Sequence, residues 1–242
     1  MKNAIRELCK TLRIGNIISE NYDDIVADTH EEFLFKLLEE AIKDRDANRK
    51  NRLMKQANFD LIKTFENYIF QDIQIPDQLD VEQLKKGSFI DRKENLILYG
   101  GVGTGKTHMA TAIGVNLTQK GKKVKFFRTA ALVNMLIDAK KDGVLGALLK
   151  KLNNVDLLIC DEWGYIPIDN QGAQLLFQVV AACYEKRSLI ITTNLDFNNW
   201  NSIFFDEKLT SAIIDRMIHH SHLLIFSGKS YRLKNSLMRK NS

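Results

Sequence analysis

The chain has 242 residues, of which 45% are hydrophobic and 27% charged, and its formal net charge is +5. These values are typical of a soluble globular protein with one sizeable α/β core and a small additional domain. Three widely spaced cysteines argue against a disulfide framework, and the charged first residues are unlike a signal peptide. No apolar run reaches the roughly 18 residues of a membrane helix, so we expect a cytoplasmic protein.

Residues 1–70 are expected to form a small all-helical N-terminal domain that serves DNA binding or oligomerisation. Apolar residues recur there at helical spacing, at Phe33, Leu37, Leu38, Ala41 and Ile42, and again at Leu53, Ala57, Leu61, Ile62, Phe65 and Ile69. The polar stretch between these groups holds Lys43, Arg45, Arg49, Lys50, Arg52 and Lys55, opposed only by Asp44 and Asp46. Residues 71–94, with Pro76 near their start, are expected to be a linker that contains a short helix.

From Asn95 onward, short apolar runs alternate with helical patterns. The predicted strands lie in NLILYG, KVKFFRT, VDLLICDE and SLIITTN, and the predicted helices in THMATAIGVNLTQKG, AALVNMLIDAKKDGVLGALLKKL and NQGAQLLFQVVAACYEKR. This alternation predicts an α/β domain over residues 95–242, with a mostly parallel sheet flanked by helices on both faces.

The turn between the first of these strands and the first helix fits the pattern G-x-x-x-x-G-K-[ST]. It consists of Gly100, Gly101, Val102, Gly103, Thr104, Gly105, Lys106 and Thr107. Glycines let successive N–H groups point at phosphate oxygens, and the following helix directs its positive end to the same place. Lys106 can neutralise the outer phosphates, and the Thr107 hydroxyl can bind Mg²⁺. On the order of one chain in a hundred of this length would contain the pattern by chance. We therefore predict nucleotide binding.

An acidic pair, Asp161 and Glu162, ends the third predicted strand. Asp161 can hold Mg²⁺ through water, and Glu162 can orient and polarise an attacking water. Asn194, which ends the run SLIITTN, can contact the γ-phosphate or that water, or else cap the strand end. A carboxylate aimed at water favours an ATPase over a small-molecule kinase, whose arginine-bearing lid and acceptor pocket we do not find.

Four stretches resemble the IstB/DnaC family of AAA+ ATPases: GGVGTGKTHMATAIG, DLLICDEWGYIPIDNQGAQLLFQVV, SLIITTN and AIIDRMIHHSHLLIFSGKSYRLKN. Residues 33–70 are similar to the N-terminal region of IstB transposition helpers, and the whole resemblance covers roughly residues 30–238. It implies a P-loop AAA+ core with little or no C-terminal lid, since the chain ends soon after its last motif.

The resemblance also implies a role for each matching residue. Residues 100–107 correspond to the Walker A loop, and Asp161 and Glu162 to Walker B. Asn194 corresponds to sensor 1, and Arg216 to an arginine finger that reaches a neighbouring subunit's site. An ion pair with Asp215 or another acid is the alternative for Arg216. Arg232 corresponds to a second sensor, although the missing lid puts that role in doubt.

Basic residues cluster in three places: the stretch from Lys43 to Lys55, the group Lys140, Lys141, Lys150 and Lys151, and the tail with Lys229, Arg232, Lys234, Arg239 and Lys240. Each cluster alone is equally consistent with a solvated surface. Together they predict contact with a nucleic-acid backbone and weak sequence preference. The resemblance favours the second cluster, because an inserted helix that tracks DNA lies there in initiator-type AAA+ proteins.

Two further groups are assigned to structure rather than to binding. His219, His220 and His222 are not expected to hold a metal, because no acidic or cysteine ligand lies nearby in the sequence. Trp163, Trp200, Phe204 and Phe205 are expected to pack in the core rather than to stack on bases.

The function that these features imply is an ATP- and Mg²⁺-dependent ATPase that assembles on double-stranded DNA as an ATP-bridged oligomer. By resemblance, it helps an IstA-type transposase to choose or capture target DNA. The main alternative is a DnaC-type replicative helicase loader, which prefers single strands. A scaffold that binds ATP without hydrolysing it is a third possibility, disfavoured by the intact Walker residues.

Overall fold

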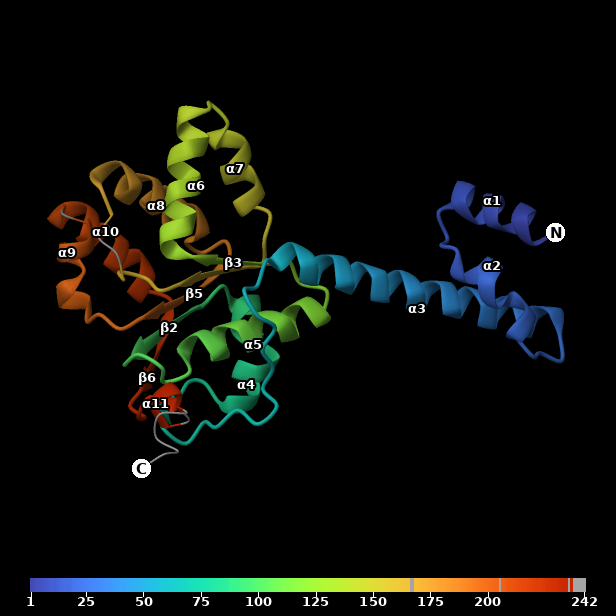
Figure 1. Ribbon diagram of the computed structural model, residues 1–242, viewed down its shortest axis with the longest axis horizontal. Coiled ribbons are helices and arrows are strands. Elements are labelled where there is room, and N and C mark those ends of the chain that lie inside the picture. Colours follow the sequence, from blue (N-terminus) through green and yellow to red (C-terminus); the bar gives the residue numbers. More distant parts are fainter. Residues whose placement is uncertain (166–167, 205, 235, 237–242) are drawn as a thin grey trace. The chain divides into compact units, whose positions relative to one another are not determined.

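The computed structural model describes residues 1–165, 168–204, 206–234 and 236, and it divides the chain into two units, Met1–Leu53 and Met54–Ser242. The first unit is helical, with α1 (Lys2–Leu12), α2 (Ile17–Asn21), the 3₁₀ turn η1 (Tyr22–Asp24) and most of α3 (His30–Ala57) (Figure 1). Its small core buries Cys9, Ile18 and Ala41.

Helix α3 ends earlier than the sequence pattern predicts. Asn58 follows it in the left-handed conformation (φ 60°), which Asn tolerates and which commonly ends a helix. Residues 58–70 are therefore irregular, and three apolar residues expected on a helical stripe, Leu61, Ile62 and Ile69, are more than half exposed. The division between the units falls before Met54 rather than near residue 70, because the aromatic residues that follow α3 pack on the second unit's core.

The second unit is built on a six-stranded sheet with the order β1-β6-β2-β5-β4-β3. The strands are β1 (Ile73–Gln74), β2 (Asn95–Gly100), β3 (Val124–Arg128), β4 (Leu157–Asp161), β5 (Ser188–Thr193) and β6 (Ser221–Phe226). All neighbours pair in parallel except β1, which is antiparallel to β6. The four predicted strands and their parallel arrangement are confirmed.

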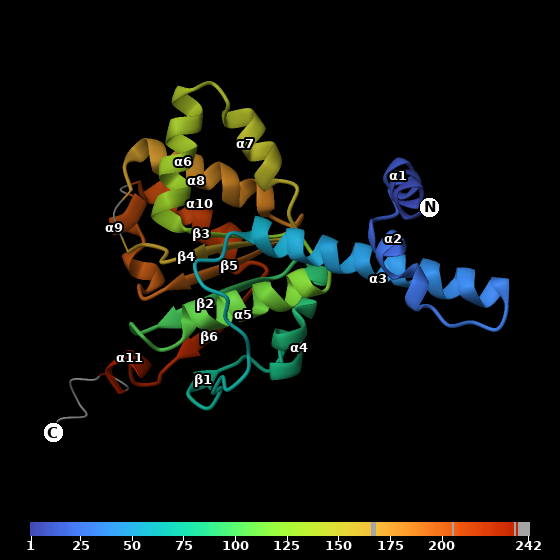
Figure 2. The same cartoon turned by 45° about the vertical axis from the view of Figure 1, so that its right-hand side comes forward.

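Helices cover both faces of this sheet (Figure 2). They are α4 (Val81–Lys86), α5 (Lys106–Gln119), α6 (Thr129–Lys141), α7 (Leu145–Leu152), α8 (Asn170–Cys183), α9 (Asn201–Phe204), α10 (Glu207–Ile218) and α11 (Tyr231–Lys234), with the 3₁₀ turns η2 (Ser88–Arg92) and η3 (Phe197–Asn199). The helical pattern of residues 130–152 is divided between α6 and α7 by a turn at Gly143 (φ 73°). No helix in the described ranges is long and apolar enough to cross a membrane.

The strands are apolar on both faces because each face meets helices. Along β2, Leu96 and Leu98 belong to the core under α4 and α5, whereas Ile97 belongs to the core under α6, α8 and α10. This alternation follows from the two-residue period of a strand. The polar residues lie instead at the carboxyl ends of the parallel strands, on the edge of the sheet where β2 leads into α5.

Residues 71–94 are not the linker that the sequence suggested. Leu79, Leu84, Phe89 and Ile90 are buried in the core beside α5, and Leu84 and Phe89 have no exposed surface. The predicted short helix is present as α4, with Asp80 and Gln83 forming a capping box. The sequence suggested a linker because the apolar residues of this segment are isolated from one another. They come together only in the fold, where they pack against α5.

Replacing Phe89 by alanine is expected to lower the free energy of unfolding by about 3–5 kcal/mol, because it empties a fully buried aromatic site. Replacing Ile69, which is 67% exposed in the same unit, is expected to change it by less than about 0.5 kcal/mol. Urea unfolding of both variants measures the difference. Equal, small effects would restore the interpretation of residues 71–94 as a linker.

Candidate nucleotide site

The loop between β2 and α5 has a conformation that depends on glycine. Gly100 and Gly103 have φ angles of 151° and 78°, which side-chain-bearing residues rarely adopt. A Cβ atom at Gly100 would lie 2.3 Å from the Phe226 carbonyl oxygen, and one at Gly103 would lie 2.3 Å from Ser230 Oγ. The strand–turn–helix context predicted for this loop is therefore present, and the chain after β6 packs directly against it.

Lys106 begins helix α5, and its ammonium group folds back over the loop. Nζ donates hydrogen bonds to the carbonyl oxygens of Gly100 at 2.7 Å and Gly101 at 2.6 Å. Burial lowers the pKa of Lys106; the Asp161 carboxylate opposes this shift, and the Arg232 guanidinium adds to it. Two cationic side chains whose charges act on each other at this loop suit an anionic ligand.

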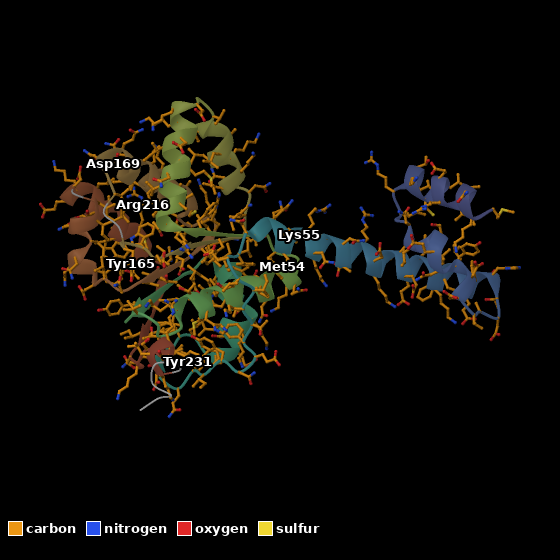
Figure 3. All side chains as sticks on the ribbon, in the orientation of Figure 1. Met54, Lys55, Tyr165, Asp169, Arg216 and Tyr231 are labelled. Carbon is orange, nitrogen blue, oxygen red and sulfur yellow. The ribbon has the colours of Figure 1, made fainter. Side chains whose placement is uncertain are left out.

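The segment that carries Arg232 is fixed to the loop by the backbone. The Tyr231 N–H donates to the Gly103 carbonyl oxygen at 2.9 Å, and Figure 3 labels Tyr231 at the start of α11. Arg232 itself is exposed. Arg232 therefore directly follows the residue that bonds the phosphate loop, and its contact with nucleotide stays a prediction.

Thr107 and Asp161 meet at the carboxyl edge of the sheet. The Thr107 hydroxyl donates to the two Asp161 carboxylate oxygens at 2.9 and 3.1 Å, and Asp161 is buried. A hydroxyl and a carboxylate are oxygen ligands of the kind that Mg²⁺ prefers, and it binds through one or two carboxylates, its own waters and substrate phosphates. The pair fits a Mg²⁺ ion held beside the phosphates.

Thr192, which the sequence analysis did not single out, organises both acidic residues. Its hydroxyl donates to Asp161 Oδ1 at 2.5 Å and accepts the Glu162 N–H at 3.0 Å. Its carbonyl oxygen accepts the Trp163 N–H at 2.8 Å. These bonds support Glu162 in a left-handed conformation (φ 58°) that glutamate rarely adopts. The signal in the sequence was the pair of threonines before Asn194.

The Glu162 side chain is exposed at the edge of a pocket of about 270 Å³. The pocket lies between α6 and the chain that follows β4, and its polar lining includes Thr129, Asn134, Tyr165 and Asp169. A solvent-accessible carboxylate beside a buried, hydroxyl-bonded one gives the two acids different environments. Asp161 is buried and bonded to two hydroxyl groups, whereas the Glu162 side chain is open to solvent.

Asn194 and Arg216 occupy different parts of the unit. Asn194 is exposed directly after β5, at the same edge of the sheet as Asp161. Arg216 lies on α10, on the face that α8 also covers, with its guanidinium 5.0 Å from the Phe177 ring and Nη1 donating to the Ala212 carbonyl oxygen (Figure 3). Within the described ranges Arg216 forms no ion pair with Asp215 or any other acid.

The aromatic residues pack as predicted. Trp163, Trp200 and Phe204 are buried, with ring centroids 5.6–6.4 Å apart. Phe205 lies outside the described residues. The histidines do have an acid beside them in the fold, contrary to the expectation from the sequence: Glu185 Oε1 lies 3.3 Å from His220 Nε2, and His219 is adjacent.

Most of the basic residues singled out for DNA are exposed. These are Arg45, Arg49 and Arg52 on α3, Lys140 and Lys141 on α6, and Lys150 and Lys151 on α7. Lys50 is half-buried and pairs with Asp46, and Lys43 pairs with Glu39, an acid that the count by sequence had left out. Arg239 and Lys240 of the tail lie outside the described residues.

Comparison with known proteins gives a consistent result. The family model described as IstB-like ATP binding protein matches residues 18–239. A protein of insertion sequence IS5376 from Geobacillus stearothermophilus, named as ATP-binding, is 36% identical over 99% of this chain and 98% of its own length. The corresponding protein of insertion sequence IS21 from Pseudomonas aeruginosa is 38% identical over 85% of this chain and 77% of its own.

Solved structures share the fold. The replication initiator DnaA, bound to AMPPCP and single-stranded DNA, superposes with a TM-score of 0.58 at 20% identity, covering 76% of this chain and 57% of DnaA. The DnaC helicase loader superposes with a TM-score of 0.50 at 24% identity, covering 61% of this chain and 92% of DnaC. These likenesses show an AAA+ P-loop fold, and the family match over residues 18–239, with the 36% identical relative, shows that the chain belongs to the IstB-like ATP binding proteins.

Proposed function

We propose that the protein is an ATPase that assembles on double-stranded DNA and assists the transposase of an insertion sequence in selecting or capturing target DNA. The proposed ATPase activity rests on the hydrogen bonds that join Thr107, Asp161 and Thr192 beside an exposed Glu162. The transposition context rests on the relatives, which are proteins of insertion sequences. A protein that acts on DNA in this way would work in the cytoplasm.

The residues of the chain divide the work of hydrolysis. The loop N–H groups, Lys106 and Arg232 bind the phosphates. Thr107 and Asp161 would hold Mg²⁺, which would neutralise charge on the phosphate oxygens. Glu162 accepts hydrogen bonding from the attacking water and orients it toward the γ-phosphate. Asn194, at the same edge, contacts that water or the γ-phosphate.

Arg216 is assigned to a neighbouring subunit's site. Its contacts with Phe177 and Ala212 orient the guanidinium without neutralising it, since neither partner is an acid. A guanidinium supplied by a neighbour stabilises the transition state only when subunits meet, so hydrolysis would depend on assembly. The helical N-terminal unit, with its basic helix α3, is the further candidate for oligomerisation or DNA contact.

The hairpin of α6 and α7 is the surface that we assign to DNA. It follows β3, an edge strand of the sheet, and both views show it extending beyond the sheet (Figures 1 and 2). Its four lysines, Lys140, Lys141, Lys150 and Lys151, are exposed, and among them only Lys141 has a described acidic partner, Asp138 at 3.9 Å. Such a surface suits the phosphate backbone rather than base edges.

Removing two of these lysines, by Lys150→Ala with Lys151→Ala, is expected to weaken duplex binding and to lower the slope of log K against log salt by roughly 2. The matched control removes Lys122 and Lys123, which carry the same charge and contact Asp91 and Asn154 instead. Binding is measured with and without ATP and Mg²⁺, on duplex and single-stranded DNA, across a salt series.

The outcomes separate the candidate functions. Cooperative, ATP-dependent and salt-sensitive binding to duplex supports the proposal. A preference for single strands would favour a helicase loader instead. If neither nucleic acid binds in either nucleotide state, the DNA part of the proposal fails and only the nucleotide site remains.

A further inference from the structure

The segment that follows α3, residues 58–70, contacts the nucleotide site; we call it the strap. It begins against α5, where the Phe59 ring fills the space beside Gly114 and lies 6.1 Å from the Phe126 ring. Its Thr64 carbonyl oxygen lies 2.7 Å from His108 Nε2 on the first turn of α5. The strap therefore runs along the helix that starts at Lys106.

Tyr68 makes the closest contact of the strap with the phosphate loop. Its hydroxyl donates to the Gly105 carbonyl oxygen at 3.2 Å, and the same oxygen accepts the Met109 N–H at 2.9 Å as the first hydrogen bond of α5. Gly105 packs closely on this hydroxyl, since a Cβ there would lie 3.1 Å from it.

This carbonyl belongs to the peptide unit whose N–H is that of Lys106. In a trans peptide the C=O and N–H point in opposite directions. When two donors hold the Gly105 oxygen toward α5, the Lys106 N–H points out of the helix start, toward the phosphate position. Fixing one end of this unit therefore fixes the donor at the other end.

The tyrosine ring is itself held in place. It lies 5.8 Å from the Phe65 ring and 4.9 Å from each of the Phe70 and His108 rings. Burial raises the pKa of Tyr68 above its ordinary value, so the hydroxyl stays protonated and remains a donor. Because other rings pack around the Tyr68 ring, its hydroxyl is held in a fixed direction toward the Gly105 carbonyl oxygen.

We propose that Tyr68 is a positioning residue of the nucleotide site, which orients the Gly105–Lys106 peptide so that the Lys106 N–H faces the nucleotide phosphates. The proposal rests on the nucleotide site being used as described above.

The test replaces Tyr68 by phenylalanine, which removes the hydroxyl and keeps the ring. The lost hydrogen bond contributes about 1 kcal/mol, and the part of it that orients the peptide is expected to weaken binding of a non-hydrolysable ATP analogue by up to roughly fivefold. GTP and inorganic tripolyphosphate should weaken by the same factor, because the effect acts on the phosphates. The matched control is Tyr184→Phe, whose hydroxyl bonds His219 at the opposite end of the sheet and should leave all three affinities unchanged.

Each result decides the proposal. Unchanged affinities in Tyr68→Phe would overturn it, and so would weakening confined to ATP, which would mean that the ring reads the base. A lower Tm without nucleotide, together with normal affinities, would show a merely structural tyrosine. A chain that binds no nucleotide even with Tyr68 intact would instead reject the nucleotide site, so the two failures are distinguishable.

Discussion

Replacing Glu162 by glutamine is expected to lower kcat for ATP about 100- to 1000-fold and to leave ATP affinity within about twofold. Glutamine has the same shape but accepts a proton far less readily, so the attacking water loses its base. The backbone at position 162 is held through its N–H by Thr192, and that bond survives the substitution. Single-turnover phosphate release measures the first effect, and equilibrium binding measures the second.

Glu185→Gln is the matched control for this variant. Glu185 is also an exposed glutamate with a left-handed backbone (φ 56°), and it lies in the turn before β5, away from the phosphate loop. It should hydrolyse ATP at the unmodified rate. If Glu162→Gln retained full turnover, the water would have to be activated by another group, and the assignment of Glu162 as base would be wrong.

The nucleotide loop could be predicted from the sequence because its chemistry is local. Eight consecutive residues define it, between a short apolar run that forms β2 and a longer stretch that forms α5. Asp161 and Glu162 could be added because carboxyl ends of parallel strands share one edge of a sheet. The same edge carries Asn194, directly after β5, although its role stays a prediction.

The rest of the site depends on contacts between distant segments. Thr192 reaches Asp161 only when β5 pairs with β4 in a register that sets Ile191 beside Cys160. Nothing in the pattern of SLIITTN shows which hydroxyl faces the acid. A periodic pattern also cannot show that a segment packs on a neighbour instead of continuing a helix, which is why residues 58–70 were expected to be helical.

The same limit explains the error at residues 71–94. Leu84 and Phe89 are separated by polar residues and give no strong period, yet both are fully buried. Burial of this kind is decided by α5, whose own apolar face needs a partner. Sequence patterns therefore identify elements whose apolar residues recur with a clear period. They miss segments that are buried only because they pack against another element.

Replacing Lys106 by alanine is expected to weaken ATP binding about 100-fold, since a charged hydrogen bond to phosphate contributes roughly 1.5–3 kcal/mol. Lys120→Ala is the control, because Lys120 lies at the other end of α5 and its ammonium group has one described hydrogen bond, to the Lys86 carbonyl oxygen. ATP titrations on both variants measure the difference. The loss should be specific, because the described hydrogen bonds of the Lys106 ammonium within the protein go to the loop carbonyls of Gly100 and Gly101.

The effect on DNA then tests how ATP and assembly are linked. If bound ATP stabilises assembly and hydrolysis ends it, Lys106→Ala should not assemble on duplex at ATP concentrations that saturate the unmodified protein. Glu162→Gln should do the opposite and stay assembled, because it binds ATP and cannot release the phosphate. Assembly by Lys106→Ala under these conditions would separate DNA binding from the nucleotide, and the proposed cycle would fail even if both residues act in hydrolysis.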